Sequence, residues 1–384
     1  MNRRMEQLDS IRGLASLSVM LHHLSLVTSI SAVPFLFWKY SPFTIIISGH
    51  SAVILFFILS GFVLSLPFLN GEKISYKSYL LKRVCRIYIP YAIAMSTAMA
   101  MYAIFSKNGI PQLSSWFNIS WTTKVNGRLI LEHFLLIGRF NSDQFDNVIW
   151  SLIHEMRISI IFPVIGMIVM KLNWKHSLLI GIILSMLSII NIVFHFEPTD
   201  GYHTAFSFTL HYISMFLIGG IIAKERAGLV KLYKTYSSKK VKVTLFFIAL
   251  CCYTYYWILL ERMVSGPLSW FAEISSDYII ALGCTILIVF AMASNRIANI
   301  LLKHPLKMLG NISYSLYLYH LIVLNSLVYA FFHTLQLNVI YLLTIVLSLI
   351  IAFFSYRYVE TPAIRLGKYA TKTTSRKNTD SVSM

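Results

Sequence analysis

Long blocks of apolar residues recur along almost the whole chain. A helix needs about 20 mostly apolar residues to cross the hydrocarbon core of a bilayer, which is about 30 Å thick. Only 12% of the 384 residues are charged, about half the fraction usual in soluble domains. The blocks therefore predict an all-α, polytopic membrane bundle of about ten transmembrane helices, at about residues 11–30, 43–66, 87–106, 149–170, 177–195, 204–223, 243–260, 277–294, 312–332 and 338–356.

The basic residues predict the orientation of this bundle, because Lys and Arg gather in cytoplasmic loops. If the N-terminus is cytoplasmic, the inner segments hold 26 of the 33 basic residues and the outer segments hold 6, while Arg157 falls within the fourth block. This split predicts that both termini are cytoplasmic. It also assigns the net charge of +18 to the inner face and to anionic membrane lipid, and it argues against a nucleic-acid partner.

The bundle is expected to fill residues 1–362, followed by a disordered cytoplasmic tail at 363–384. The N-terminal residues MNRRMEQLDSIRG lack a cleavage site, so the first block is expected to stay as a helix. The longest outer segment, about 107–148, is the part best suited to contact a large partner, and about 129–138 fits a further interfacial helix. The four cysteines form no CxxC pair and no His spacing indicates zinc, so no metal is expected.

Two ionisable groups stand out in the first and fourth blocks, where such groups are costly and indicate function by default. His23 follows Arg12 by eleven residues, which returns to nearly the same helix face about 16 Å further along. Glu155 shares a face with Ser151 and Ser159, at a depth that we estimate to match His23. A carboxylate can orient a catalytic imidazole. Each residue also has a structural interpretation. Arg12 could extend toward the membrane surface, His23 could form a hydrogen bond with a neighbouring helix, and Glu155 could belong to a structural ion pair.

Two further polar patterns have both a functional and a structural interpretation. Arg83 and Arg86 share a face at the cytoplasmic start of the third block, where guanidinium groups suit phosphate, but topology and lipid contact explain an isolated pair as well. Ser313, Tyr317 and His320 form one stripe in the ninth block. They could line a polar cavity, together with Ser151, or form a hydrogen-bond ladder between helices.

Six segments occur in a fixed order over about residues 8–362: LDSIRGLASLSVMLHH, LFFILSGFVLS, KRVCRIYIPY, WSLIHE, LGNISYSLYLYH and YVETP. In this set the chain resembles the membrane acyltransferase-3 family, which acylates mainly extracytoplasmic carbohydrates. The resemblance implies a ten-helix bundle. It also implies that the essential histidine of the family is His23, that Arg83 and Arg86 serve binding of an acyl-CoA, and that Arg12 and Glu155 are the family's first-span arginine and WSLxxE glutamate.

The sequence departs from the family pattern at two points. Ile54 and Leu55 stand where many members carry an acidic or polar residue, so a polar role there is not expected. Some members add an eleventh span and a periplasmic SGNH-type domain, and an extension of that kind is not found after the tenth block. The membrane part is therefore expected to act alone or with a partner.

Together these features predict an O-acyltransferase of a bacterial inner membrane. It would transfer an acyl group, most simply acetyl, from cytoplasmic acetyl-CoA or another short acyl-CoA to a hydroxyl of a cell-surface or lipid-linked carbohydrate. His23 would act as base or nucleophile with Glu155 assisting, and glycan-assembly proteins are candidate partners. The alternative is a secondary transporter or flippase with a His/Glu proton relay, although the internal repeat common in transporters is not evident.

Overall fold

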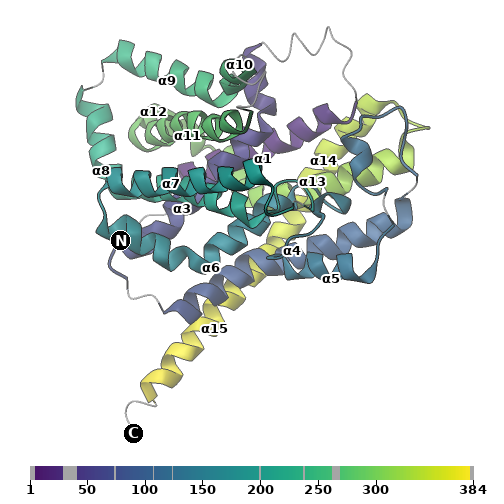
Figure 1. Cartoon of the computed structure of the whole chain (residues 1–384), viewed down its shortest axis with the longest axis horizontal. Helices are drawn as coiled ribbons and strands as arrows, with labels where there is room; N and C mark the ends of the chain where they lie inside the picture. The colour runs from purple at the N-terminus through teal and green to yellow at the C-terminus, as the bar shows by residue number, and fades with distance from the viewer. Residues whose placement is uncertain are drawn as a thin grey trace.

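The computed structural model describes residues 5–28, 41–72, 75–106, 108–122, 124–198, 200–236, 238–261 and 269–380, and the regular structure in these ranges is entirely helical (Figure 1). Short 3-10 helices occur at Pro42–Ile47, Phe117–Ile119 and Ser142–Gln144, and a π-helix at Tyr356–Glu360 joins α14 to α15. The α-helices are α1 Glu6–Leu26, α3 Gly49–Leu69, α4 Tyr76–Phe105, α5 Gly127–Leu135, α6 Ile149–Lys171, α7 Trp174–Phe194, α8 Phe206–Tyr236, α9 Lys239–Thr254, α10 Tyr256–Glu261, α11 Ser269–Ala293, α12 Asn295–Leu301, α13 His304–Phe331, α14 Leu337–Ser355 and α15 Thr361–Asp380.

Eight of the described helices are long and apolar enough to cross a membrane: α3, α4, α6, α7, α8, α11, α13 and α14. The prediction of a polytopic helical membrane bundle is thus confirmed. The other two predicted spans correspond to α1, which carries Glu6, Asp9 and Arg12 in its first two turns, and to α9, which has only 16 residues. The cytoplasmic location of both termini stays a prediction.

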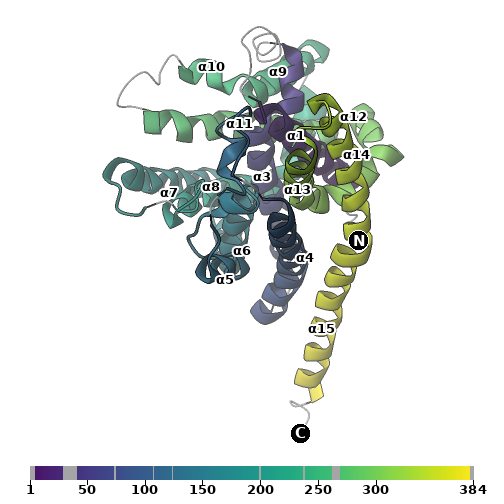
Figure 2. The same ribbon diagram turned by 90° about the vertical axis from the view of Figure 1, so that its right-hand side faces the viewer.

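Glycines allow the central helices to approach each other closely. A Cβ added at Gly13 in α1 would lie 2.5 Å from the backbone nitrogen of Gly310 in α13, and one at Gly310 would lie 2.5 Å from the carbonyl oxygen of Asp9. Gly61 in α3 and Gly219 in α8 likewise contact the backbone of each other's helix. These crossings place α1, α3 and α13 together in the interior of the bundle (Figure 2).

The described residues of the long segment at about 107–148, which the charge pattern predicts to lie on the outer side, pack as a cap on the bundle, called here the outer cap. Trp121 is fully buried and its indole nitrogen donates to the carbonyl of Phe145 at 2.9 Å. Ser114 Oγ donates to the carbonyl of Leu26 at 2.5 Å, which ties the cap to the end of α1. As a result, Trp116 stacks on His23, with ring centroids 5.3 Å apart. The predicted interfacial helix at about 129–138 corresponds to α5.

Arg157 anchors this cap from within α6. Its guanidinium donates to the carbonyls of Ile137, Gly138 and Thr204 at 3.0, 2.6 and 2.9 Å, and to the hydroxyl of Thr209 at 3.0 Å. A buried arginine needs several acceptors because its charge cannot be removed at physiological pH. The side chain therefore joins the end of the outer cap to the segment before α8.

The C-terminal segment differs from the expectation of disorder. Residues 363–380 belong to α15, which projects from the bundle (Figures 1 and 2), while 381–384 lie outside the described residues. Ala363, Gly367 and Thr371 recur at i, i+4 and i+8 and are buried, and a Cβ at Gly367 would lie 3.0 Å from the Cβ of Cys85 in α4. This apolar stripe packs α15 on α4, which is why the basic composition of the segment does not keep it unfolded.

Candidate active site

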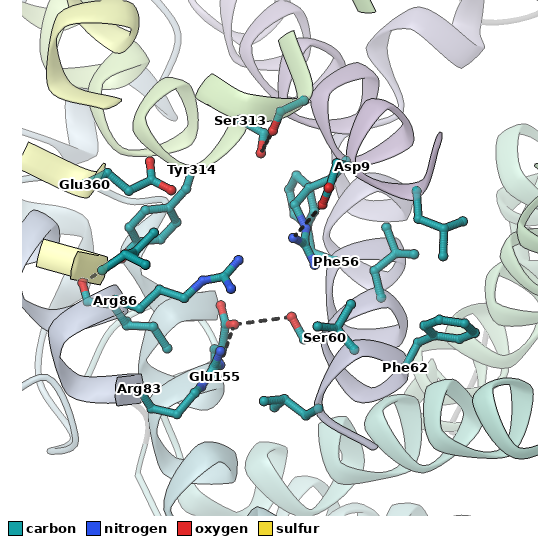
Figure 3. A pocket seen from close by; sticks show the side chains of 18 of the residues that line it. Asp9, Phe56, Ser60, Phe62, Arg83, Arg86, Glu155, Ser313, Tyr314 and Glu360 are labelled. Atoms are coloured by element: carbon teal, nitrogen blue, oxygen red, sulfur yellow. Dashed lines mark hydrogen bonds and ion pairs between the residues drawn. The ribbon is translucent and has the colours of Figure 1, made fainter. Parts of the chain in front are cut away.

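A cavity of about 670 Å³ opens between α1, α3, α4, α6, α13 and α15 (Figure 3). Its mouth is lined by the start of α1, the N-terminal halves of α4 and α13, the end of α3, and α15. These parts lie toward the face that the charge pattern predicts to be cytoplasmic. Seven of the residues that the sequence indicates line this cavity: Arg12, Arg83, Arg86, Ser151, Glu155, Ser313 and Tyr317.

Glu155 and Arg83 form an ion pair inside the cavity. Arg83 Nη2 lies 3.0 Å from Glu155 Oε1 and 2.9 Å from Ser159 Oγ, and Ser60 Oγ donates to the same carboxylate oxygen at 3.2 Å. The i, i+4 spacing of Glu155 and Ser159 along α6 turns both toward α4, where Arg83 meets them. The expected contact of Glu155 with His23 is not formed, because the face of α6 that carries Glu155 meets α3 and α4.

The two arginines of the RxxR segment have different environments. Arg83 is buried and its charge is balanced by Glu155, whereas Arg86 is exposed within the cavity (Figure 3). Arg12 reaches the cavity from α1 and lies 3.8 Å from Asp9. A guanidinium that is exposed in a cavity can bind an anion more readily than one that already pairs with a carboxylate. Arg86 is thus the cation of this pair best suited to a phosphate.

His23 pairs with His320, and this pair fixes which ring nitrogens carry protons. His320 Nδ1 lies 3.0 Å from the carbonyl oxygen of Leu316, which can only accept, so this nitrogen must carry the hydrogen. In the neutral ring, His320 Nε2 is then the acceptor for His23 Nδ1 at 2.9 Å. The network assigns a lone pair to His23 Nε2, the property of a base or nucleophile.

Tyr317 lies between the cavity and this histidine pair. Its ring lines the cavity, packs edge-on against Phe56 with centroids 5.6 Å apart, and lies 6.1 Å from the His320 ring. Its hydroxyl donates to the carbonyl of Val148 at 2.9 Å and lies 2.7 Å from Ser151 Oγ. His23 and His320 are not among the residues that line the cavity. Tyr317 and Phe56 therefore close the inner end of the cavity.

A second buried polar cluster lies elsewhere in the bundle. Asp277 in α11 pairs with His50 in α3 at 2.6 Å and with His211 in α8 at 2.9 Å, and His211 Nδ1 lies 3.0 Å from Ser185 Oγ. Sequence reasoning did not single out these residues, although an acid and two histidines within apolar blocks were visible signals. Glu360, within YVETP, was also missed as a site residue; it lines the cavity and accepts from Ser315 at 3.0 Å.

The fold and this site define a polytopic membrane protein whose bundle encloses an arginine-lined cavity. The chain belongs to the acyltransferase-3 family, whose sequence pattern, described as an acyltransferase domain, matches residues 5–357. The resemblance drawn from the six segments is thereby confirmed.

Relatives of the chain include staphylococcal proteins. O-acetyltransferase OatA of Staphylococcus aureus strain NCTC 8325 is 24% identical over 387 residues, covering 95% of this chain and 58% of that protein. A protein of strain MSSA476, named provisionally as an O-acetyltransferase, is 26% identical over 381 residues, covering 94% of this chain and 57% of that protein. The chain thus spans little more than half the length of these relatives. No solved structure matches it.

Proposed function

We propose that this acyltransferase domain transfers an acyl group, most simply acetyl, from acetyl-CoA to a hydroxyl of a cell-surface or lipid-linked carbohydrate. The observation that carries the proposal is the arginine-lined cavity. Tyr317 lines its inner end, and the Tyr317 ring contacts His320 of the histidine pair with centroids 6.1 Å apart. The names of the staphylococcal relatives support acetyl as the acyl group. A bacterial cytoplasmic membrane, with glycan-assembly proteins as neighbours, is part of the same proposal.

In this proposal the donor enters from the cytoplasmic side with its thioester end first. Its diphosphate lies against Arg86 and Arg12, because charge-assisted hydrogen bonds from guanidinium to phosphate are strong and geometrically specific. Arg83 does not contact the donor directly. It neutralises Glu155 at 3.0 Å and thereby keeps a carboxylate of the cavity lining from repelling the phosphates. The apolar and tyrosine-rich inner part of the cavity suits the pantetheine arm.

The chemistry assigned to His23 uses its Nε2 lone pair. The acceptor hydroxyl loses its proton to this nitrogen, the new C–O bond forms as the C–S bond breaks, and the proton passes to the thiolate of the released CoA. His320 positions the ring by accepting from His23 Nδ1. If His23 carries the acyl group instead, the same nitrogen attacks the thioester first. The two routes differ in one species, an acylated protein that forms without acceptor.

The test is transfer of label from acetyl-CoA to surface glycan in cells that make His23→Ala at the wild-type membrane level. We expect transfer to fall by at least about 10²-fold, the smallest contribution usual for a general base. His195→Ala, at an exposed position after α7, is the matched control and should keep full activity. Normal transfer by His23→Ala would remove His23 from the mechanism. Transport of a solute without consumption of acetyl-CoA would instead favour a transporter.

A further inference from the structure

One face of α15 lines the mouth of the cavity. Thr361, Ile364, Arg365 and Lys368 line the cavity, and their spacing of i, i+3, i+4 and i+7 places them in one stripe along the helix. All four follow the residues matched by the family pattern, which end at 357. The stripe adds two cations to the cavity mouth, from a segment that composition alone suggested to be an unstructured tail.

The orientation of this stripe is fixed by packing and by the turn before it. Gly367 and its buried neighbours along the helix hold the adjacent face of α15 against α4. The π-helix at Tyr356–Glu360 is followed by Thr361 and Pro362, and Pro362 lacks the backbone N–H that a continuous α-helix would use there. The extra residue in this turn sets the direction in which α15 leaves α14. Arg365 and Lys368 therefore face the cavity because the helix cannot rotate freely.

Among the described residues, the two α15 cations that line the cavity are not paired with a carboxylate. Arg83 pairs with Glu155 and Arg12 with Asp9, whereas within the described parts of the chain no ion pair or hydrogen bond is found for the side chain of Arg365 or Lys368. Both side chains are exposed at the mouth. Two like charges, three residues apart on one helix face, repel each other, so the pair is stabilised when an anion binds between them.

We propose that Arg365 and Lys368 bind the phosphate monoester at the end of the donor farthest from its thioester, which in acetyl-CoA is the 3′-phosphate. This inference rests on the proposed function. It follows from the order of groups along the donor: the thioester leads toward Tyr317, the diphosphate follows near Arg86, and the 3′-phosphate comes last, at the mouth. The shared chemistry is a phosphate group, so an anionic lipid headgroup is the competing source, and the experiment separates the two.

The experiment measures dissociation constants of acetyl-CoA and acetyl-3′-dephospho-CoA for the full chain in vesicles of neutral lipid. We expect the wild type to bind acetyl-CoA about tenfold more tightly than the dephospho donor, as for charge-assisted contacts at a partly exposed site. Arg365→Ala with Lys368→Ala should bind both donors equally, at the wild-type affinity for the dephospho donor. Arg365→Lys with Lys368→Arg should retain the preference. Arg357→Ala, an exposed cation of the preceding turn outside this cavity, is the control and should behave as wild type.

Each outcome decides a different point. A wild type that binds neither donor contradicts the proposed function itself. A wild type that binds both donors equally, or a double alanine variant that keeps the preference, contradicts the 3′-phosphate site while leaving acetyl-CoA as donor. The same constants are then measured with anionic lipid added to the vesicles. If the double alanine variant differs from wild type only in its response to this lipid, the two cations bind lipid and the inference is wrong. Equal amounts of each folded variant in the vesicles are required throughout.

Discussion

At the residue scale, the functional properties of His23 come from its neighbours. A carbonyl at Leu316 determines the tautomer of His320, and His320 in turn determines that of His23. Trp116 stacks on the His23 ring with centroids 5.3 Å apart, and the hydrogen bond to His320 holds the Nδ1 edge of that ring, so both neighbours restrict its rotation. The outer cap thus contributes an aromatic side chain, Trp116, directly to the surroundings of His23.

We predict that His320→Ala lowers kcat by about 10²-fold, because His23 loses the acceptor that keeps its Nε2 unprotonated. The KM for donor should change little, since His320 does not line the cavity. His320→Gln, whose amide oxygen can accept from His23 Nδ1, should recover part of the loss. The measurement is transfer from labelled acetyl-CoA over a range of donor concentrations. An equal loss in both variants would mean that His320 acts through packing alone.

Asp146 gives a prediction on stability. It is 1% exposed before the start of α6, its Oδ1 has no hydrogen-bond partner among the described residues, and burial raises the pKa of its carboxyl well above the usual range. In the unfolded chain this carboxyl has a pKa of about 3.9. Because the folded state binds the proton more tightly than the unfolded state, the free energy of unfolding falls as pH rises above that value.

Asp146→Asn should therefore unfold at a temperature higher than wild type by a few degrees at neutral pH. This advantage should vanish at a pH below the unfolded pKa, where both side chains are uncharged. Thermal unfolding in detergent at several pH values is the measurement. Asp200→Asn, at an exposed position of the same outer face, should show no such trend. A constant difference at all pH values would assign the effect to packing.

At the element scale, helix packing determines which polar groups meet. The sequence predicts the helices well, because their apolar runs depend on the bilayer thickness alone. It does not predict the partner of Glu155, because depth along one helix does not fix which neighbouring helix its face meets. The estimate that Glu155 and His23 share a depth was insufficient for this reason. Arg83 could have been considered as the partner of Glu155, since a carboxylate within a helix bundle usually has a cation nearby.

Two segments show where composition misleads. The basic residues of α15 suggested disorder, but its small residues pack on α4, and this depends on the shape of α4 near Cys85. The seventh apolar block was expected to span as one helix, but it divides into α9 and α10 at Tyr255. Local composition records apolar content, whereas the continuity of a helix is also decided by its contacts.

The close crossing of α1 and α13 gives an element-scale prediction. Gly13→Ala should reduce the folded yield strongly, with a loss of about 2 kcal/mol or more, because its Cβ would lie 2.5 Å from the Gly310 backbone, and neither helix can move without repacking. The matched control is Gly228→Ala in α8, where nothing lies within 4 Å of the added Cβ. That change should be neutral or stabilising by up to about 1 kcal/mol.

The measurement is the fraction of each variant recovered as monodisperse protein, together with its unfolding temperature. Equal behaviour of Gly13→Ala and Gly228→Ala would show that α1 and α13 can separate at no cost. Because α1 carries both Arg12 and His23, any such shift would also change the distance from the cavity to the histidine pair.

At the scale of the whole molecule, the bundle holds the cationic cavity and the histidine pair in two separate regions. The cavity carries its cations on the face where Lys and Arg predominate in the sequence, and the His23–His320 pair lies beyond Tyr317, under the outer cap. The charge distribution of the sequence predicts this polarity of the molecule. It does not predict the barrier, because Phe56 and Tyr317 belong to different helices and meet only in the folded bundle.

The barrier must open if acyl groups pass from donor to His23, and this leads to our last prediction. Tyr317→Ala removes the ring that closes the cavity, so water should reach the thioester and release CoA without acceptor several-fold faster than in wild type, while coupled transfer falls. Tyr317→Phe keeps the ring but loses the hydrogen bonds to Val148 and Ser151. It should keep the barrier closed to water and retain more transfer than the alanine variant. Thiol release with and without acceptor measures both quantities. If neither variant changes the ratio of transfer to hydrolysis, the acyl group takes another path, and Tyr317 serves only to pack α13 against α3 and α6.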